Sequence, residues 1–198
     1  MDTDKNTATI FLGRHCKTQW NLEDRLIGTT DLPLCEYGKK EAVENIPKIK
    51  DLNVGRIICS DLKRAVDTAS TYSESLGIQM EISAGLREID HGTWNGIEKE
   101  KLLKESPEFR KFYEGDPTTV PIPNGTEEIV DAQQRIKAEI KRIALGYPGE
   151  RVLVIMHKHI RSILTCTLED IPLSHFKENI NESVVPFEIP QDQLSRIL

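Results

Sequence analysis

The feature that most constrains the fold is the segment Arg151 to Met156, R-V-L-V-I-M, in which every residue after the first is apolar. This pattern predicts a buried β-strand. Two shorter apolar segments, Ala8 to Leu12 and Arg56 to Cys59, also predict strands. Because their apolar residues are continuous rather than alternating, we expect a sheet that is covered on both faces.

Three segments between the predicted strands carry apolar residues at helical spacing, and each is expected to pack one face into the core. These residues are Ala42, Val43, Ile46 and Ile49, then Leu62, Ala65, Val66, Ala69 and Leu76, and finally Ile129, Ala132, Ile136, Ile140 and Ile143. The alternation predicts the α/β class, as a three-layer α/β/α sandwich with a mixed, mainly parallel sheet. Ligands of such folds bind beyond the carboxyl ends of the strands, where His15 and His157 fall.

The length of 198 residues fits a single domain spanning 1–198. A hydrophobic content of 38% with 29% charged residues is typical of a soluble globular protein. The segment 91–126 is less regular, and its prolines and glycines indicate a loop insertion. We expect a helical piece around Glu98 to Tyr113 on this insertion, which would form part of the wall of a pocket.

The charge and the cysteines exclude several other classes. A net charge of −6 argues against nucleic acid as a partner. No apolar run reaches membrane-spanning length and the N-terminus lacks a basic-then-apolar pattern, so we expect a cytoplasmic protein without membrane contact. The cysteines form no C-x-x-C pair, which argues against a zinc knuckle or a disulfide framework. The sequence does not indicate an oligomeric state.

Five separated segments resemble the histidine phosphatase superfamily, also called the phosphoglycerate mutase-like family. Leu12 to Asn21, L-G-R-H-C-K-T-Q-W-N, is similar to its R-H-G-x-T-x-x-N signature, and the segment from Arg25 to Gly38 matches its R-x-x-G-x-x-D-x-P-L-x-x-x-G stretch. Further similar segments are Cys59 to Ala69, Leu86 to Gly96 and Val152 to His157. Because these segments occur in the order of the family, the resemblance is far more specific than one motif.

The resemblance implies a role for each matching residue. His15 would be the nucleophile, His157 the second histidine and Glu88 the proton donor, with Asp90 as a nearby alternative donor. Arg14, Arg64 and Asn21 would bind the phosphoryl group. Chemistry asks for the same residue types, because a transferring phosphoryl group without magnesium needs fixed cations and donors. A guanidinium presents a planar fork to phosphate oxygens.

The chain departs from the family pattern near both histidines. Cys16 and Lys158 replace glycines, Lys17 replaces a common glutamate, and M-H-K-H-I-R is one residue shorter than the usual H-G-G-x-I-R. Side chains in place of the glycines are expected to narrow or reshape the phosphate cradle. Lys17 and Lys158 are also candidate substrate-binding residues, since their charge predicts a substrate with a second anionic group.

Two other kinds of site fit the sequence less well. A cysteine phosphatase needs C-x₅-R, but the counts from Cys16 and Cys59 do not reach an arginine. A metal site built from His15, Cys16, His157 and His159 would lie beside two arginines that repel a cation, so no metal is expected. Cys16 is either a reactive thiol or an inert small side chain. His91 and His159 have no role in this interpretation.

The predicted protein is therefore a metal-independent phosphomonoester hydrolase of the histidine acid phosphatase type. It would act through a phosphohistidine on a small phosphorylated metabolite, without a cofactor. Two alternatives remain: a cofactor-primed phosphoglycerate mutase with the same covalent intermediate, and a pseudo-enzyme that binds a phosphorylated ligand with weak or no turnover. The shorter chain favours the phosphatase over the mutase by analogy with the family.

Overall fold

The computed structural model describes residues 6–198 and contains a five-stranded sheet. The strands lie in the order β3 (Gln79–Ser83), β2 (Arg56–Ser60), β4 (Arg151–Met156), β1 (Thr9–Arg14) and β5 (Phe187–Glu188). The first four run parallel, and β5 pairs antiparallel with β1. The predicted mixed, mainly parallel sheet is confirmed.

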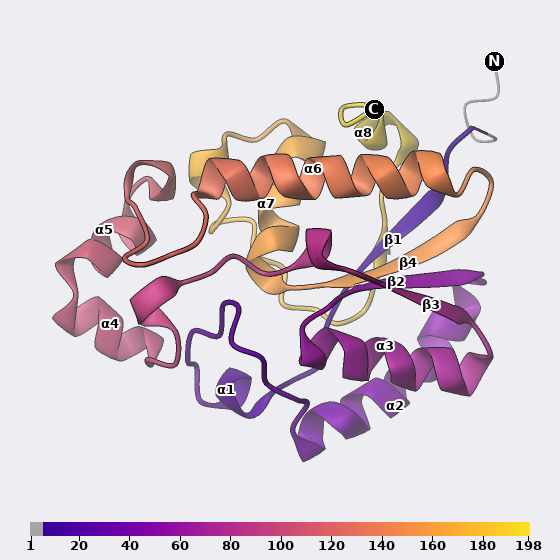
Figure 1. The fold of residues 1–198 in the computed structure, drawn as a ribbon, viewed down its shortest axis with the longest axis horizontal. Helices are drawn as coiled ribbons and strands as arrows, with labels where there is room; N and C mark the ends of the chain where they lie inside the picture. The colour runs from indigo at the N-terminus through magenta and orange to yellow at the C-terminus, as the bar shows by residue number, and fades with distance from the viewer. Residues whose placement is uncertain (1–5) are drawn as a thin grey trace.

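Helices cover both faces of this sheet (Figure 1). On one face lie α2 (Glu36–Asp51) and α3 (Lys63–Leu76), and on the other lie α6 (Ile129–Gly146), α7 (Lys158–Glu169) and the short α8 (Gln191–Leu194). Each face has its own apolar core, because β1 sends Phe11 into one and Ile10 and Leu12 into the other. The three-layer α/β/α arrangement is therefore also confirmed.

The elements match the predicted ones with small differences. β4 has the predicted bounds, whereas β1 continues past Gly13 to Arg14, so that the strand itself holds the arginine. Val43 is 57% exposed, and its expected place in the core is wrong. Ala42 and Ile49 are buried on α2 together with Asn45, whereas Val43 lies one residue, about 100°, further around the helix.

The insertion at 91–126 carries two helices where one was expected, α4 (Lys99–Glu105) and α5 (Pro107–Glu114). Ser106 separates them, and its hydroxyl accepts a hydrogen bond from the Phe109 N–H at 3.1 Å, as an N-cap does. Pro107 cannot donate a backbone hydrogen bond and so begins a helix rather than continuing one. The two helices lie at one end of the sheet, near the short α1 (Gln19–Leu22) (Figure 1).

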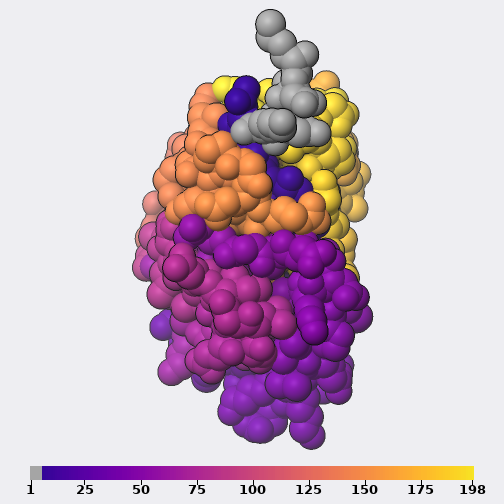
Figure 2. Space-filling model, turned by 90° about the vertical axis from the view of Figure 1, so that its right-hand side faces the viewer, coloured from indigo at the N-terminus to yellow at the C-terminus, as the bar shows by residue number. Residues whose placement is uncertain are grey.

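The opposite end of the molecule shows how the chain is divided between the two faces (Figure 2). Segments coloured violet to magenta, which include α2 and α3, form one half of this surface, and orange to yellow segments form the other half. The chain thus completes one helical layer before it builds most of the second. Within residues 6–198, none of the helices has the length and apolar character needed to cross a bilayer.

Candidate active site

The register of the two central strands brings His15 and His157 together. Arg14 pairs with Met156 in the β1–β4 ladder, so each histidine is the next residue beyond a paired strand end. The His15 N–H donates to the Met156 carbonyl at 3.0 Å, and the two imidazole centroids lie 5.1 Å apart. The parallel sheet therefore delivers both histidines to its carboxyl edge, as the sequence predicted.

The hydrogen bonds of His15 define its tautomer. Nδ1 lies 2.7 Å from the Cys16 carbonyl, which can only accept, so Nδ1 carries the proton. Nε2 accepts from the Arg64 Nε–H at 3.2 Å and therefore bears the lone pair. Burial, together with the charges of Arg64 and Arg14, holds the pKa of His15 well below its ordinary value. The ring is neutral, with its unprotonated nitrogen directed toward the arginine.

Arg64 stands on the first turn of α3 and is fixed by the loop before α2. Its Nη1 donates to the Thr30 carbonyl at 2.9 Å and its Nη2 to the Gly28 carbonyl at 2.7 Å. Burial lowers the pKa of Arg64 to about 10, so the guanidinium stays charged at neutral pH. A fixed cation beside His15 Nε2 is the arrangement that a phosphoryl group requires.

Arg14 supplies a second buried guanidinium. Its Nη1 donates to the Glu182 carbonyl at 3.0 Å and lies 4.0 Å from the Glu182 carboxylate. Its Nε is buried without a hydrogen-bond partner among the described residues. Arg14 thus retains a donor for a ligand.

His157 is fully buried, and within residues 6–198 neither of its ring nitrogens has a hydrogen-bond partner. It is the N-cap of α7, which starts at the next residue, so the shortened segment leads from strand to helix without a loop. Burial, followed by the charge of Arg64, holds the pKa of His157 well below its ordinary value. Leaving a polar group unpaired in a protein interior costs about 1–3 kcal/mol. The unpaired ring nitrogens of His157 are therefore available to bond a ligand.

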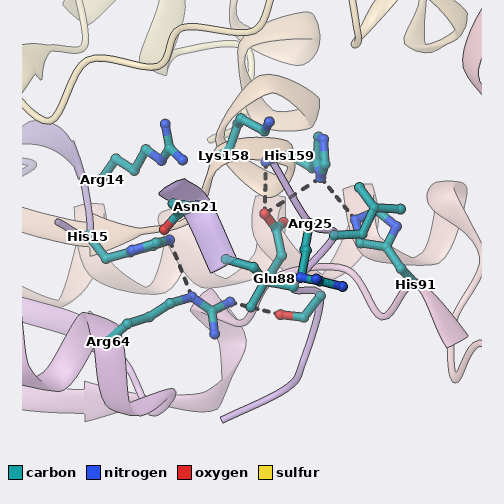
Figure 3. A pocket seen from close by; sticks show the side chains of 12 residues that line it. Arg14, His15, Asn21, Arg25, Arg64, Glu88, His91, Lys158 and His159 are labelled. Atoms are coloured by element: carbon teal, nitrogen blue, oxygen red, sulfur yellow. Dashed lines mark hydrogen bonds and ion pairs between the residues drawn. The ribbon is translucent and has the colours of Figure 1, made fainter. Parts of the chain in front are cut away.

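Glu88 lies in the loop between two short 3₁₀ turns, and three backbone N–H groups fix its carboxylate. Those of Ile89 and His159 donate at 3.0 Å and that of Ile160 at 2.8 Å. The last two belong to the first turn of α7, where N–H groups have no partner within the helix. In the view of Figure 3, Glu88 lies between His15 on one side and a second pair of histidines, His91 and His159, on the other.

Asp90, the alternative proton donor, is occupied by structural bonds. Its Oδ1 accepts from the Gly92 N–H at 3.0 Å and from the Asn95 amide at 2.9 Å. Burial opposes ionisation, but these hydrogen bonds hold the pKa of Asp90 below its ordinary value. Glu88 lines the pocket beside His15 and Asp90 does not, so the geometry favours Glu88 as the donor.

These side chains surround a pocket with about 330 Å³ of empty space. Of the residues that the sequence singled out, six line it: Arg14, His15, Asn21, Arg64, Glu88 and Lys158. His157 lies against His15 rather than on the wall, and Lys17 is not a wall residue. Asn21 uses its amide oxygen to accept from the Thr18 N–H at 3.0 Å, so its NH₂ group is the part left for a ligand.

Lys158 and Cys16 do not obstruct the pocket in the way that the loss of two glycines suggests. Neither has a positive φ, so the backbone does not require glycine there. The Cys16 thiol points into the core, 3.8 Å from the Tyr72 hydroxyl. Lys158 lines the pocket, with its ammonium 3.2 Å from the Glu182 carboxylate. The expected narrowing at Cys16 is wrong because its side chain faces away.

The thiol of Cys16 is also not activated. Burial raises the pKa of Cys16 to about 12, so thiolate is scarce at neutral pH. The burial of the thiol favours the inert interpretation of Cys16 over the reactive one. Since the thiol faces the core and His159 bonds another histidine, the four residues of the alternative metal site do not converge.

His91 and His159 both line the pocket, although neither has a role in the interpretation of the sequence. His91 Nε2 and His159 Nδ1 are 3.0 Å apart and share a hydrogen bond. Burial lowers the pKa of His91 to about 4, and it holds that of His159 well below the ordinary value. His91 lies within the matched segment Leu86 to Gly96, as Arg25 and Gly28, also at the pocket, lie within another, but the resemblance assigned His91 and His159 no role.

Comparison with known proteins identifies the family. Residues 10–194 match the model of the histidine phosphatase superfamily, branch 1. The chain belongs to this superfamily.

Named relatives include both mutase-like and phosphatase proteins. Phosphoglycerate mutase-like protein 4 of Arabidopsis thaliana is 30% identical over 156 residues, which cover 78% of this chain and 68% of the relative. Phosphoserine phosphatase 1 of Hydrogenobacter thermophilus is 29% identical, with 90% of this chain and 86% of the relative covered. A solved mycobacterial glucosyl-3-phosphoglycerate phosphatase has a TM-score of 0.74 at 25% identity, covering 87% of this chain and 86% of that one. The fold is therefore phosphoglycerate mutase-like.

Proposed function

We propose that this protein is a metal-independent phosphomonoester hydrolase that works through a phosphohistidine on His15, with the chemistry of a histidine acid phosphatase. The observation that carries the proposal is the fixed tautomer of His15, whose unprotonated Nε2 lies 3.2 Å from the Arg64 guanidinium. A neutral imidazole of this tautomer attacks phosphorus through Nε2, while Nδ1 stays bonded to the Cys16 carbonyl.

In the first half-reaction, His15 Nε2 forms a bond to phosphorus as the bond from phosphorus to the ester oxygen breaks. Charge on the equatorial oxygens is balanced by Arg14 and Arg64, both buried and both fixed by backbone carbonyls. His157 and the Asn21 amide add donors, and neutral His157 donates without becoming a second base. Protonated Glu88 gives its proton to the departing oxygen.

In the second half-reaction, water attacks the phosphohistidine and Glu88, now a carboxylate, takes a proton from it. The bond from Nε2 to phosphorus breaks, and inorganic phosphate and neutral His15 remain. The backbone N–H groups that hold Glu88 keep the carboxylate in place between the two steps. No group other than water is consumed, so the cycle closes without a cofactor.

The relatives leave two rival functions to be tested. A mutase would return the phosphoryl group to a second alcohol, and relatives with mutase names support this alternative. The named phosphatases support hydrolysis. A pseudo-enzyme would bind the ester without turnover, but Cys16, one of the two replaced glycines that suggested it, does not reach the pocket.

The deciding experiment is a rapid-quench reaction with a ³²P-labelled ester in the presence and absence of EDTA. We expect acid-labile, base-stable phosphate on His15, burst release of the alcohol and unchanged rates with EDTA. Labelled phosphate on a cysteine, or a rate that the chelator abolishes, would refute the proposed chemistry. Transfer of label to an added acceptor alcohol would identify a mutase, and ester binding without label would identify a pseudo-enzyme.

A further inference from the structure

A second cavity adjoins the phosphate pocket on the far side of Glu88. Its empty space, including solvent at the open mouth, is about 470 Å³. It shares Arg25, Leu26, His91, Lys158 and His159 with the first pocket. We call it the aromatic cavity, because Phe109, Phe112, Tyr113 and Phe176 line it. The first three of these belong to α5, on the insertion.

Glu88 lies beside His159, one of the residues that the two cavities share. Its Oε2 accepts from the His159 N–H at 3.0 Å and lies 3.8 Å from His159 Nδ1, and His159 lines both cavities. The oxygen that receives the proton from Glu88 therefore sits where the two cavities meet. With the phosphoryl group beside His15, the rest of the ester extends into the aromatic cavity.

The apolar walls of this cavity suit a flat ring. Phe109 and Tyr113 stack with centroids 5.7 Å apart, and the His159 ring meets Phe176 edge-on at 6.1 Å. Phe109 and Phe176 are buried, so these rings are held in place before any ligand arrives. Rings that are fixed in advance favour an apolar partner, because little side-chain freedom is lost on binding.

The charges of the cavity distinguish one lysine from the others. The Lys177 ammonium bonds the carbonyls of Phe112, Tyr113 and Gly115, and Lys158 is paired with Glu182. Lys99 contacts only the face of Tyr113, at 4.4 Å from the ring centroid, and forms no ion pair within residues 6–198. Within residues 6–198, Lys99 is thus the lysine of this cavity whose ammonium bonds neither a carboxylate nor a carbonyl oxygen.

We propose that the aromatic cavity binds the alcohol part of the substrate, and that this alcohol carries an aromatic ring and an anionic group recognised by Lys99. The inference rests on the proposed function and adds a substrate class to it. It also replaces Lys17 as a source of the second-anion preference, because Lys17 lines neither cavity. Asp24, the one carboxylate on the described wall of the aromatic cavity, opposes an anionic alcohol, but the same wall carries Arg25 and three lysines, Lys99, Lys158 and Lys177, so positive side chains outnumber it.

The test compares 4-carboxyphenyl phosphate with phenyl phosphate, which differ only in the second anion. The wild-type chain should show a KM about 2- to 5-fold lower for the carboxylated ester, the range expected of a partly screened ion pair. In Lys99→Met the ratio of the two KM values should fall to about 1. Lys104→Met is the matched control, since Lys104 lies on the same helix, exposed and paired with Glu100, and should keep the wild-type ratio.

A second variant tests the ring. Tyr113→Leu keeps an apolar side chain but removes the aromatic face, and should raise KM for both aryl esters by about 2- to 10-fold relative to methyl phosphate. An equal KM for the two aryl esters in the wild-type protein, or an unchanged ratio in Lys99→Met, would overturn the assignment of the cavity.

Binding of the matching phosphonates separates this proposal from the proposed function. If no ester is hydrolysed but 4-carboxyphenylphosphonate binds more tightly than phenylphosphonate, and Lys99→Met removes that difference, the hydrolase proposal fails and the cavity assignment stands. If esters are hydrolysed and the two phosphonates bind equally, the cavity assignment fails and the hydrolase proposal stands. If neither phosphonate binds, the cavity assignment fails as well.

Discussion

The two histidine pairs of the pocket are alike in spacing and opposite in bonding. His15 and His157 have ring centroids 5.1 Å apart, and His91 and His159 have theirs 4.9 Å apart. The second pair shares a hydrogen bond, whereas in the first pair His15 bonds a carbonyl and an arginine and His157 bonds nothing among the described residues. We call His15 and His157 the open pair, because neither ring bonds the other, and His91 and His159 the closed pair, because each ring is held by the other. The difference teaches that close spacing alone does not decide what a pair of histidines can bind.

The largest effect is expected when the open pair loses His15. His15→Ala should lower kcat by on the order of 10⁴-fold or more, because no other group can form the covalent intermediate. Steady-state hydrolysis of an aryl phosphate, with circular dichroism to verify folding, measures this. The contrast between the two pairs would be contradicted if His15→Ala retained a tenth of the wild-type activity, or if His91→Phe lost as much activity as His15→Ala.

The second largest effect is expected at Glu88, the proposed acid, which lies between the two histidine pairs. Glu88→Gln should lower kcat/KM for an alkyl phosphate by about 10²–10⁴-fold and by much less for an activated aryl phosphate, whose leaving group needs no proton. Because two helix N–H groups face this carboxylate, the glutamine NH₂ must turn away from at least one of them. Thermal unfolding of the variant controls for that cost. Equal losses with both esters would place the acid role elsewhere.

Acidification should affect both pairs alike, since all four rings are buried and neutral. Each has its folded pKa below the ordinary value of about 6.5, so the unfolded chain binds protons first as pH falls. Stability is therefore full above pH ~6.5 and declines below it, by up to about 1.4 kcal/mol per pH unit for each ring. Urea unfolding at pH 7.0, 6.0 and 5.0 measures this decline. A free energy of unfolding that stays constant over this range would contradict it.

The smallest effect is expected at the closed pair. His91→Phe keeps an aromatic ring but leaves His159 Nδ1 without its partner, at a cost of about 1–3 kcal/mol in the free energy of unfolding. Because one buried histidine is removed, the free energy of unfolding should also decline less steeply below pH 6.5, by the contribution of that one ring. Activity toward an aryl phosphate should change by less than about 10-fold. A loss comparable to that of His15→Ala would show that the closed pair takes part in the chemistry.

Much of this site could be predicted because strand ends are local features. Apolar runs placed His15 and His157 directly after two strands, and parallel pairing then required them to meet. The resemblance to the family supplied Glu88, which no periodicity marks. Its position depends on the first turn of α7, more than seventy residues away in the sequence.

What could not be predicted depends on the paths of loops. Glu182 reaches Arg14 and Lys158 from a segment with no regular structure, and His91 meets His159 across 68 residues of sequence. The direction in which a side chain next to a strand points also could not be predicted from the sequence. Cys16 and Lys17 are neighbours of His15, yet the thiol enters the core and Lys17 lies off the wall.

Arg64 and His157 would respond differently if selection for activity were relaxed. Arg64 joins α3 to the loop before α2 through two carbonyls, so its loss would weaken the fold as well as the chemistry. The His157 side chain forms no hydrogen bond within residues 6–198, and an apolar residue could replace its buried ring with a gain in stability. In descendants that retain only the fold, the arginine would therefore persist after the histidine is lost. We therefore expect His157 to be the more informative marker of an active enzyme among relatives of this chain.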